Sequence, residues 1–222
     1  MDSIWINAPA KINIGLDVIR RREDGYHEVK MIMQSIRLFD RLTLTKTKEP
    51  GIKLTTNLSY LPVNEDNLVY QSAKRLMDEF HLEGGLDIKL DKRIPVAAGM
   101  AGGSTDAASC MLAINDLYGL GLSKRHLMKR GVKLGADIPY CILKGICDRL
   151  ENVLETVTIK EYPIIEEVKK HLMDQGAMGA LMSGSGPTVF GIFDDKDKAM
   201  AAKEKCRELP YRCFVFVTDL YR

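Results

Sequence analysis

The sequence predicts an α+β protein organised in two halves. Period-two alternation of apolar and polar residues marks strands near the N-terminus, and period-3.6 patterns mark helices farther along the chain. The predicted elements follow the order β–β–α–β–α–α and then α–α–β–β–α–β, which is typical of an α+β architecture. We therefore expect a first domain over residues 1–145 and a second over residues 146–222.

The first half is expected to begin as β-structure. Alternation predicts strands at Ile4–Asn7 and Ile12–Ile19, with Pro9 interrupting them because proline lacks the N–H that a strand ladder uses. Imperfect alternation over Ser35–Thr47 predicts a further strand pair, and Ile52–Thr56 predicts a short strand. A sheet is thus expected before the first helix.

Helices alternate with one strand in the rest of the first half. A helix over Asn67–His81 is expected to be capped by Asp66, and a strand is expected over Leu86–Leu90. A second helix is predicted over Ser104–Tyr118, because its apolar residues recur on one face. These residues are Ala107, Met111, Ile114 and Tyr118.

A third helix is expected to be capped by Ser123 and to end at Gly135. The elements expected beyond it are helices at 148–157 and 163–175, a hairpin within 179–193, a helix at 196–208 and a final strand at 211–219. The second half is therefore predicted to be a small mixed domain.

Composition and charge exclude several classes of protein. A hydrophobic content of 45% and a charged content of 28% are those of a soluble globular protein. The net charge of +2 is spread along the chain and predicts no nucleic-acid surface. The 5 cysteines and 4 histidines show no zinc spacing. Without a signal segment or a membrane span, we expect reduced thiols and a cytoplasmic location.

A glycine-rich stretch, "IPVAAGMAGGSTDAASC" at 94–110, could form a turn or bind phosphate. It matches neither the Walker A pattern nor the dinucleotide-binding G-x-G-x-x-G. Its glycines lead into a helix N-terminus at Ser104, where free N–H groups and the helix dipole suit an anion. Ser104 and Thr105 could cap the helix, contact a phosphate or hold a metal ion. The stretch alone leaves these alternatives open.

Other candidate residues are also ambiguous when taken singly. Lys11 lies among small and apolar residues, where a lysine usually has an anionic partner. Asp137 follows an expected helix end and precedes an apolar stretch, although aspartate is common in turns. Tyr26 and His27 could bind a flat ring or fill a loop, and the glycines of 183–186 could form a turn or a binding loop.

Three stretches, taken in their order along the chain, resemble the three motifs of the GHMP kinase superfamily of small-molecule kinases. They read "PAKINIGLDV…DGYHEV", "PVAAGMAGGSTDAA" and "SGSGPTVF". The stretches "DGYHE" and "GADIPYC" narrow the resemblance to members that phosphorylate a cytidine diphosphate derivative in the non-mevalonate isoprenoid pathway. The resemblance implies a GHMP kinase fold, with a ribosomal protein S5 domain 2-like N-terminal domain and a ferredoxin-like C-terminal domain.

The resemblance also implies that ATP donates a phosphoryl group to the 2-hydroxyl of the acceptor, with Mg²⁺ expected. Asp137 matches the catalytic base and Lys11 the lysine paired with it. The residues that match the ATP side are Asn67, Pro95, Gly99, Gly102, Gly103, Ser104 and Thr105. The residues that match the acceptor side are Asn13, Tyr26, His27, Ser183, Gly184, Ser185 and Gly186. A monomer or weak homodimer is expected, and no metal ligand is assigned.

The sequence departs from the family pattern after Gly145. The next residues, "ICDRLENVLETVTI", resemble a family segment that lies about sixty residues later. A block that carries part of the C-terminal sheet and an aromatic residue beside the cytosine is therefore expected to be missing. Either the protein lacks this block or the sequence omits residues of it, and we favour the second interpretation. An exposed sheet edge is expected where the block is absent.

Overall fold

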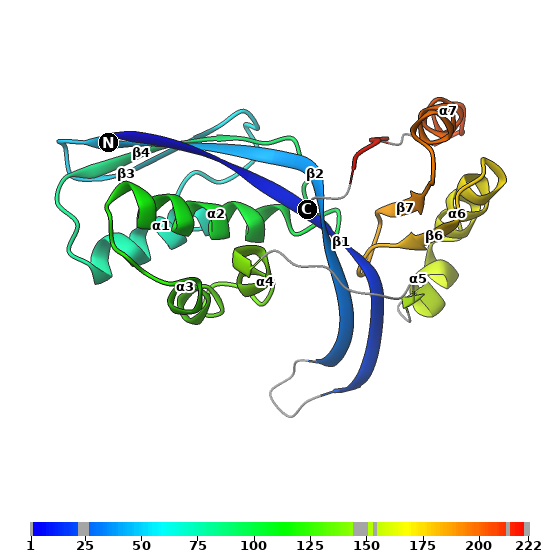
Figure 1. Cartoon of the computed structure of the whole chain (residues 1–222), viewed down its shortest axis with the longest axis horizontal. Coiled ribbons are helices and arrows are strands. Elements are labelled where there is room, and N and C mark those ends of the chain that lie inside the picture. Colours follow the sequence, from blue (N-terminus) through cyan, green and yellow to red (C-terminus); the bar gives the residue numbers. More distant parts are fainter. Residues whose placement is uncertain (1, 22–26, 144–150, 153–154, 212–213, 220–222) are drawn as a thin grey trace. The chain divides into compact units, whose positions relative to one another are not determined.

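The computed structural model describes residues 2–21, 27–143, 151–152, 155–211 and 214–219 (Figure 1). Its strands are β1 (Ser3–Arg21), β2 (His27–Thr47), β3 (Gly51–Thr56), β4 (Gly85–Asp91), β5 (Glu151–Asn152), β6 (Gly179–Met182) and β7 (Val189–Ile192). Its helices are α1 (Leu68–Glu79), α2 (Gly102–Leu117), α3 (Lys124–Gly131), α4 (Ile138–Leu143), α5 (Glu155–Glu161), α6 (Ile164–Asp174) and α7 (Lys196–Cys206).

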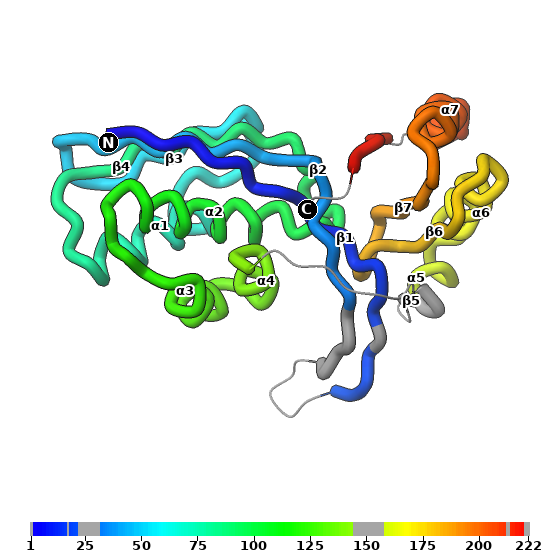
Figure 2. Tube along the Cα trace, in the orientation of Figure 1, coloured from blue at the N-terminus to red at the C-terminus, as the bar shows by residue number. Residues whose placement is uncertain are grey.

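The chain divides into two compact units that are interleaved in sequence. The first unit comprises Met1–Lys11, Ile36–Ala97 and Ala101–Gly145, and the second comprises Ile12–Ser35, Ala98–Met100 and Ile146–Arg222. The strands β1 and β2 each continue from one unit into the other, as the chain trace in Figure 2 shows. One change of unit falls after Gly145, at the expected domain boundary, whereas parts of two N-terminal strands group with the second unit.

The first unit packs helices on a sheet. Within the sheet order β3-β4-β2-β1-β5, β3 and β4 are parallel and are joined through α1, whereas β2 and β4 are antiparallel. Leu44 is paired with Ile88, and both side chains are fully buried. In Figure 1, α1 and α2 lie along one face of this sheet, with α3 and α4 beyond them. The predicted α+β class is confirmed, because the expected strands and helices form one layered core.

Helix α2 is the centre of that core. Ala107, Met111 and Ile114, which the periodicity places on one face, are each 0% exposed. Burial extends well beyond this face, since most of the helix from Thr105 onward is inaccessible to solvent. Because α2 is held on several sides, its N-terminal turn has a fixed position within the first unit.

The second unit contains a hairpin and two helices that pack together. The strands β6 and β7 are antiparallel, with Met182 opposite Val189, so the predicted hairpin is confirmed. A small apolar core is formed by Leu172 of α6, Ala177 and Cys206 of α7. The predicted helix at 163–175 is confirmed as α6.

Two predictions about the N-terminal strands are wrong. Pro9 does not interrupt the first strand, and β2 is one continuous strand where a pair was expected over Ser35–Thr47. Within the described residues, β1 pairs with β5 only at Gly15 and Leu16, so near Pro9 it has a strand neighbour on one side. A proline at such an edge leaves no ladder hydrogen bond unmade.

The helix ends also differ from the expectations. The N-cap of α1 is Asn67 in place of Asp66, because the side chain of Asn67 accepts from the backbone N–H of Val69. Ser123 caps α3 as predicted, by accepting from the backbone N–H of His126. The same helix ends at Gly131, before the expected Gly135, and a turn follows.

The C-terminal expectations are partly wrong. The helix expected over 148–157 lies partly outside the described residues, and the described part contains β5 and then the start of α5. No strand forms over the described residues 214–219, and Phe214 is 82% exposed. A strand needs a paired neighbour, and the C-terminal sheet has just β6 and β7 in the described part of the chain. Across all described residues, the helices are too short or too polar to cross a bilayer.

Candidate active site

Lys11 and Asp137 form an ion pair in the first unit. The Nζ atom of Lys11 lies 3.7 Å from Oδ2 of Asp137. The lysine side chain is 7% exposed and the aspartate side chain is 34% exposed. The pair therefore combines a buried ammonium group with a carboxylate that a ligand can reach. Such a carboxylate can accept a proton from a bound ligand.

Asp137 is held in place by the packing of α4 on α3. The N–H of Cys141 donates to the carbonyl of Asp137 at 3.1 Å, which ties the residue to the first turn of α4. Gly131 at the end of α3 lies so close to Ile138 that a Cβ there would be 2.5 Å from Cγ2 of Ile138. This close approach requires glycine at the end of α3. It fixes the turn that presents the carboxylate of Asp137.

The N-terminus of α2 is an uncapped helix end. The helix begins at Gly102, and its N-cap, Ala101, has φ 53 in the left-handed region and supplies no side-chain cap. Neither Ser104 nor Thr105 caps the helix. The sequence-based alternative that one of them caps α2 is therefore wrong. Gly103 is exposed at this turn and has no side chain that could block a ligand. Free N–H groups and the helix dipole at such an end favour a bound anion.

A buried charge network lies beneath this turn, and sequence reasoning missed it. Lys92, at the end of β4, donates from Nζ to Oδ2 of Asp106 at 2.7 Å and also to Asp40. All three side chains are at most 4% exposed. A Cβ on Gly102 would lie 3.1 Å from Nζ of Lys92, so the cation directly underlies the first turn of α2.

Burial and the neighbouring charges shift the pKa values of Asp106 and Lys92 within this network. Burial raises the pKa of the Asp106 carboxyl well above its usual value, and the charge of Lys92 opposes that rise. The pKa of Lys92 is raised in turn, because the charges of Asp106 and Asp40 outweigh the effect of burial. The backbone N–H groups of Arg93 and Ile94 donate to Asp40 at 2.5 and 2.8 Å. These donors hold the Asp40 carboxylate in position.

The described cysteines are structural. Cys110, Cys141 and Cys206 are free thiols and are buried. Burial raises the pKa of Cys110 and of Cys141 to about 12. Both thiols therefore stay protonated at neutral pH and are poor nucleophiles, although Cys141 lies one turn from Asp137.

In the second unit, the loop around Gly99 is held by the β6–β7 hairpin. The hydroxyl of Ser183 donates to the carbonyl of Gly99 at 3.5 Å, and the hydroxyl of Thr188 donates to the carbonyl of Ala98. The backbone N–H of Asn13 donates to the Ser183 hydroxyl at 3.2 Å. The structure thus brings together residues of all three glycine-rich or N-terminal motifs, although they are far apart in sequence.

Gly99→Ala is expected to loosen this loop. Gly99 has φ +73, and a Cβ there would lie 2.8 Å from the carbonyl oxygen of Ser183. The left-handed backbone alone costs about 1–2 kcal/mol for alanine, and the clash adds to it. We expect a lower melting temperature and a raised KM for ATP. The matched control is Gly119→Ala, because Gly119 has φ +63 and no atom within 4 Å of its Cβ position. Equal effects of the two variants on both measurements would show that the clash is unimportant.

The remaining sequence candidates are placed as follows. Asn67 uses its side chain locally, since Oδ1 accepts from Val69 and Nδ2 donates to the carbonyl of Pro62 at 2.8 Å. Gly184 and Gly186 occupy left-handed positions in the hairpin turn. In this turn, Gly184 is half-buried and Ser185 is exposed. Pro95, near the start of the glycine-rich stretch, is half-buried.

Tyr26 lies outside the described residues, and of His27 only the backbone, at the start of β2, is described. No cluster of three potential metal-binding side chains occurs in the described ranges. Magnesium, however, is commonly held by one or two protein groups together with substrate phosphates.

Two family models match the chain. The model of the GHMP kinases N terminal domain matches residues 67–145, and the model of the GHMP kinases C terminal domain matches residues 141–212. The chain belongs to the GHMP kinase family. The first model spans α1, the glycine-rich stretch and Asp137, so the core of the first unit is the family's N-terminal domain. GHMP kinases are ATP-dependent phosphotransferases, so this chain uses ATP.

Relatives of this GHMP kinase are similar over nearly the whole chain. A 4-diphosphocytidyl-2-C-methyl-D-erythritol kinase from Lachnospira eligens is 38% identical, with 100% of this chain and 99% of the relative covered. A solved 4-(cytidine 5'-diphospho)-2C-methyl-D-erythritol kinase is 29% identical, with 92% and 95% covered and a TM-score of 0.79. A homoserine kinase from Cytophaga hutchinsonii shares the fold at 18% identity, with 100% and 94% covered and a TM-score of 0.68.

The alignments also show that relatives have positions without a counterpart in the sequence of this GHMP kinase. The alignment with the Lachnospira eligens relative spans 286 positions, whereas the chain has 222 residues, so at least 64 positions have no counterpart here. This difference agrees in size with the block expected to be missing after Gly145.

Proposed function

We propose that this GHMP kinase transfers the γ-phosphate of ATP to the 2-hydroxyl of 4-diphosphocytidyl-2-C-methyl-D-erythritol. The main support is the set of relatives that carry this kinase's name, which are 36–40% identical over 89% or more of the chain. The ion pair of Lys11 and Asp137 supplies the chemistry that such a transfer needs.

In this proposal, Asp137 accepts the proton of the attacking hydroxyl. Its carboxylate is accessible to a ligand, whereas the Lys11 ammonium is buried beside it. The ammonium stabilises negative charge that develops on the phosphoryl oxygens. Phosphoryl transfer depends mostly on positioning and electrostatics, so a fixed pair of this kind is sufficient protein chemistry.

The N-terminal turn of α2 is proposed to bind the ATP phosphates. Its first N–H groups have no side-chain cap, and the buried network of Lys92 holds the turn from below. The Ser104 hydroxyl is half-exposed in this turn and is suited to hold Mg²⁺ together with the phosphates. When bound, Mg²⁺ neutralises charge on the phosphate oxygens. Asn67, Pro95, Gly99 and the residues from Gly102 to Thr105 complete the proposed ATP side.

The acceptor is proposed to contact the N-terminal strand and the C-terminal hairpin. Asn13, Tyr26 and His27 would bind the cytidine diphosphate part, with His27 at the cytosine edge. The turn from Ser183 to Gly186 borders the same site, and the bond between Asn13 and Ser183 supports this grouping. We further propose a cytoplasmic monomer or weak homodimer, in keeping with the buried free thiols in the described part of the chain.

The substrate assignment is tested by acceptor specificity. ADP release in a coupled assay with ATP and Mg²⁺ is compared for 4-diphosphocytidyl-2-C-methyl-D-erythritol, homoserine and mevalonate. We expect turnover with the first acceptor alone. Turnover confined to homoserine or mevalonate would leave the chain a GHMP kinase but remove the proposed substrate.

A second candidate function is a nucleotide-binding protein without catalysis. It is favoured by the 64 or more alignment positions that have no counterpart in the chain. An intact mass of the purified protein near 24.9 kDa would establish a true internal deletion. If that protein bound ATP but phosphorylated none of the three acceptors, this second function would replace the first. A mass several kilodaltons higher would exclude this second function.

A further inference from the structure

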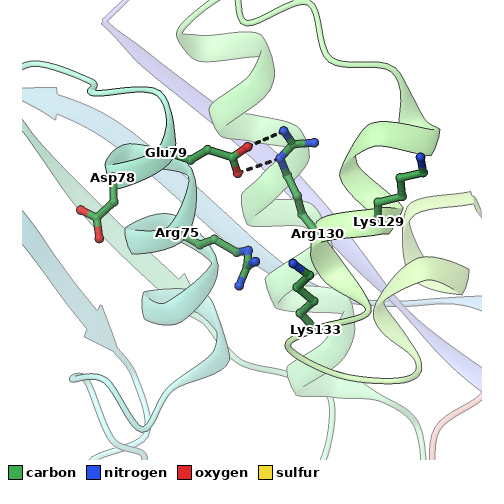
Figure 3. Close-up of a pocket in the computed structure, with 6 residues that line it drawn as sticks. All are labelled: Arg75, Asp78, Glu79, Lys129, Arg130 and Lys133. Carbon is green, nitrogen blue, oxygen red and sulfur yellow. Dashed lines mark hydrogen bonds and ion pairs between the residues drawn. The ribbon is translucent and has the colours of Figure 1, made fainter.

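A charged pocket lies between α1 and α3, and the proposed reaction does not use it. The pocket has a volume of about 670 Å³ and is lined by Arg75, Asp78, Glu79, Lys129, Arg130 and Lys133. Figure 3 shows these side chains, with Arg75, Asp78 and Glu79 coming from α1 and the others from α3 and the turn after it. None of the proposed catalytic residues lines it.

Both carboxylates of the pocket already have partners. Glu79 accepts two bonds from the guanidinium of Arg130, at 2.9 and 2.5 Å. That pairing is the main cause that lowers the pKa of Glu79, and the nearby charges of Arg75 and Lys133 add to it. Asp78 is paired with Lys74 one turn earlier, at 3.2 Å, and Figure 3 shows it pointing away from Arg130.

Three cations of the pocket form no close ion pair within the described chain, although the charge of Glu79 acts on two of them. Among the described residues, no carboxylate lies within ion-pair distance of Arg75, Lys129 or Lys133. The Nε atom of Arg75 is buried and has no hydrogen-bond partner within the described chain. In Figure 3 the side chains of Arg75 and Lys133 point toward each other. Like charges that converge in this way repel, so a bound anion would stabilise the arrangement.

Contacts within the protein hold the charged side chains of the pocket in place. Arg130 is fixed by Glu79, by a bond to the carbonyl of His126 at 2.9 Å and by its position over the ring of Phe80. This bridge ties α3 to α1 and sets the spacing between Arg75 and Lys133. A guanidinium group and ammonium groups around one space match the oxygens of a phosphate group.

We propose that this pocket binds the phosphate group of a small anionic ligand, either a diphosphate ester or free pyrophosphate. The volume lies within the range of small-molecule sites and accommodates more than one phosphate. The site shares no residue with the proposed reaction. It is also positioned to influence it, because α3 packs on α4 through Gly131 and Ile138, next to Asp137.

The test measures binding of pyrophosphate and of methyl diphosphate, an ester without a cytidine group, by calorimetry, with the nucleotide site first saturated by a non-hydrolysable ATP analogue. The variant is Arg75→Gln/Lys133→Gln. The matched control is Lys124→Gln/Arg125→Gln, which removes the same charge from exposed positions of α3 outside the pocket. We expect the pocket variant to bind at least tenfold more weakly and the control to bind like the unsubstituted protein.

Preference for methyl diphosphate would assign the site to a phosphate ester, and equal or tighter binding of pyrophosphate would assign it to the free ion. Loss of binding in both variants, or in neither, would overturn the proposal, as would the absence of binding to the unsubstituted protein. If the pocket variant does not fold, Lys129→Gln/Lys133→Gln replaces it, because both lysines are exposed. The same outcomes then apply.

Discussion

Asp137→Asn is expected to lower kcat by about 10²–10⁴-fold, the usual contribution of a general base. The amide keeps the shape of the side chain but cannot accept the hydroxyl proton. The KM for ATP is expected to change little, because the uncapped turn of α2 and the network of Lys92 are untouched. The measurement is steady-state kinetics with the acceptor that the unsubstituted enzyme turns over.

The matched control is Asp116→Asn, which makes the same chemical change at an exposed position of α2. It is expected to leave kcat unchanged. Melting temperatures of both variants separate a lost base from a lost fold. If Asp137→Asn turned over at the rate of the control, Asp137 would not be the base, and its pairing with Lys11 would be structural.

The fold was predictable where local pattern and tertiary packing agree. The hairpin of β6 and β7 and the apolar face of α2 follow from periodicity, since their side chains meet a core in the expected register. Pro9 shows where pattern alone fails. Whether a proline ends a strand depends on whether another strand lies beside it, and a single sequence does not state which strands are neighbours.

The candidate site was predictable as a set of motifs but not as a set of contacts. Lys11 and Asp137 are 126 positions apart in the sequence. Their roles were inferred from the resemblance, and the structure adds the distance between them. The network of Asp40, Lys92 and Asp106 carries no motif of its own. Each member is an ordinary charged residue until β2, β4 and α2 bring the three together.

The missing block is expected to affect the second unit most directly, because the resemblance places part of the C-terminal sheet in it. Within the described residues the β6–β7 sheet of this unit has two strands, and a two-stranded sheet is at best marginally stable alone. Phe214 and Phe216, which were expected in a further strand, are exposed. Alternation identifies residues suited to a strand, but the strand forms only when a neighbour supplies hydrogen bonds. Residues absent from the chain can therefore change the structure of residues that are present.

Lys92→Met is expected to destabilise the protein by about 3–5 kcal/mol, the usual result of removing one partner from a buried ion pair. The substitution keeps an unbranched apolar stem but leaves Asp40 and Asp106 together without their cation. Denaturant unfolding measures the loss. The control is Lys89→Met on the same strand, because Lys89 is exposed. A loss no larger than that of the control would show that the buried cation adds no stability.

The pH dependence distinguishes this network from simple packing. Burial raises the folded-state pKa of Asp106 above its unfolded value of about 4, so its contribution to stability is lost as the pH rises from that value. Without Lys92 to oppose the rise, the deficit of Lys92→Met should widen once the pH exceeds the folded-state pKa that Asp106 has in the unsubstituted protein. Asp106→Asn cannot titrate and should flatten the same profile. A deficit of Lys92→Met that stayed constant with pH would mean that lost packing, not an unpaired carboxylate, causes the destabilisation.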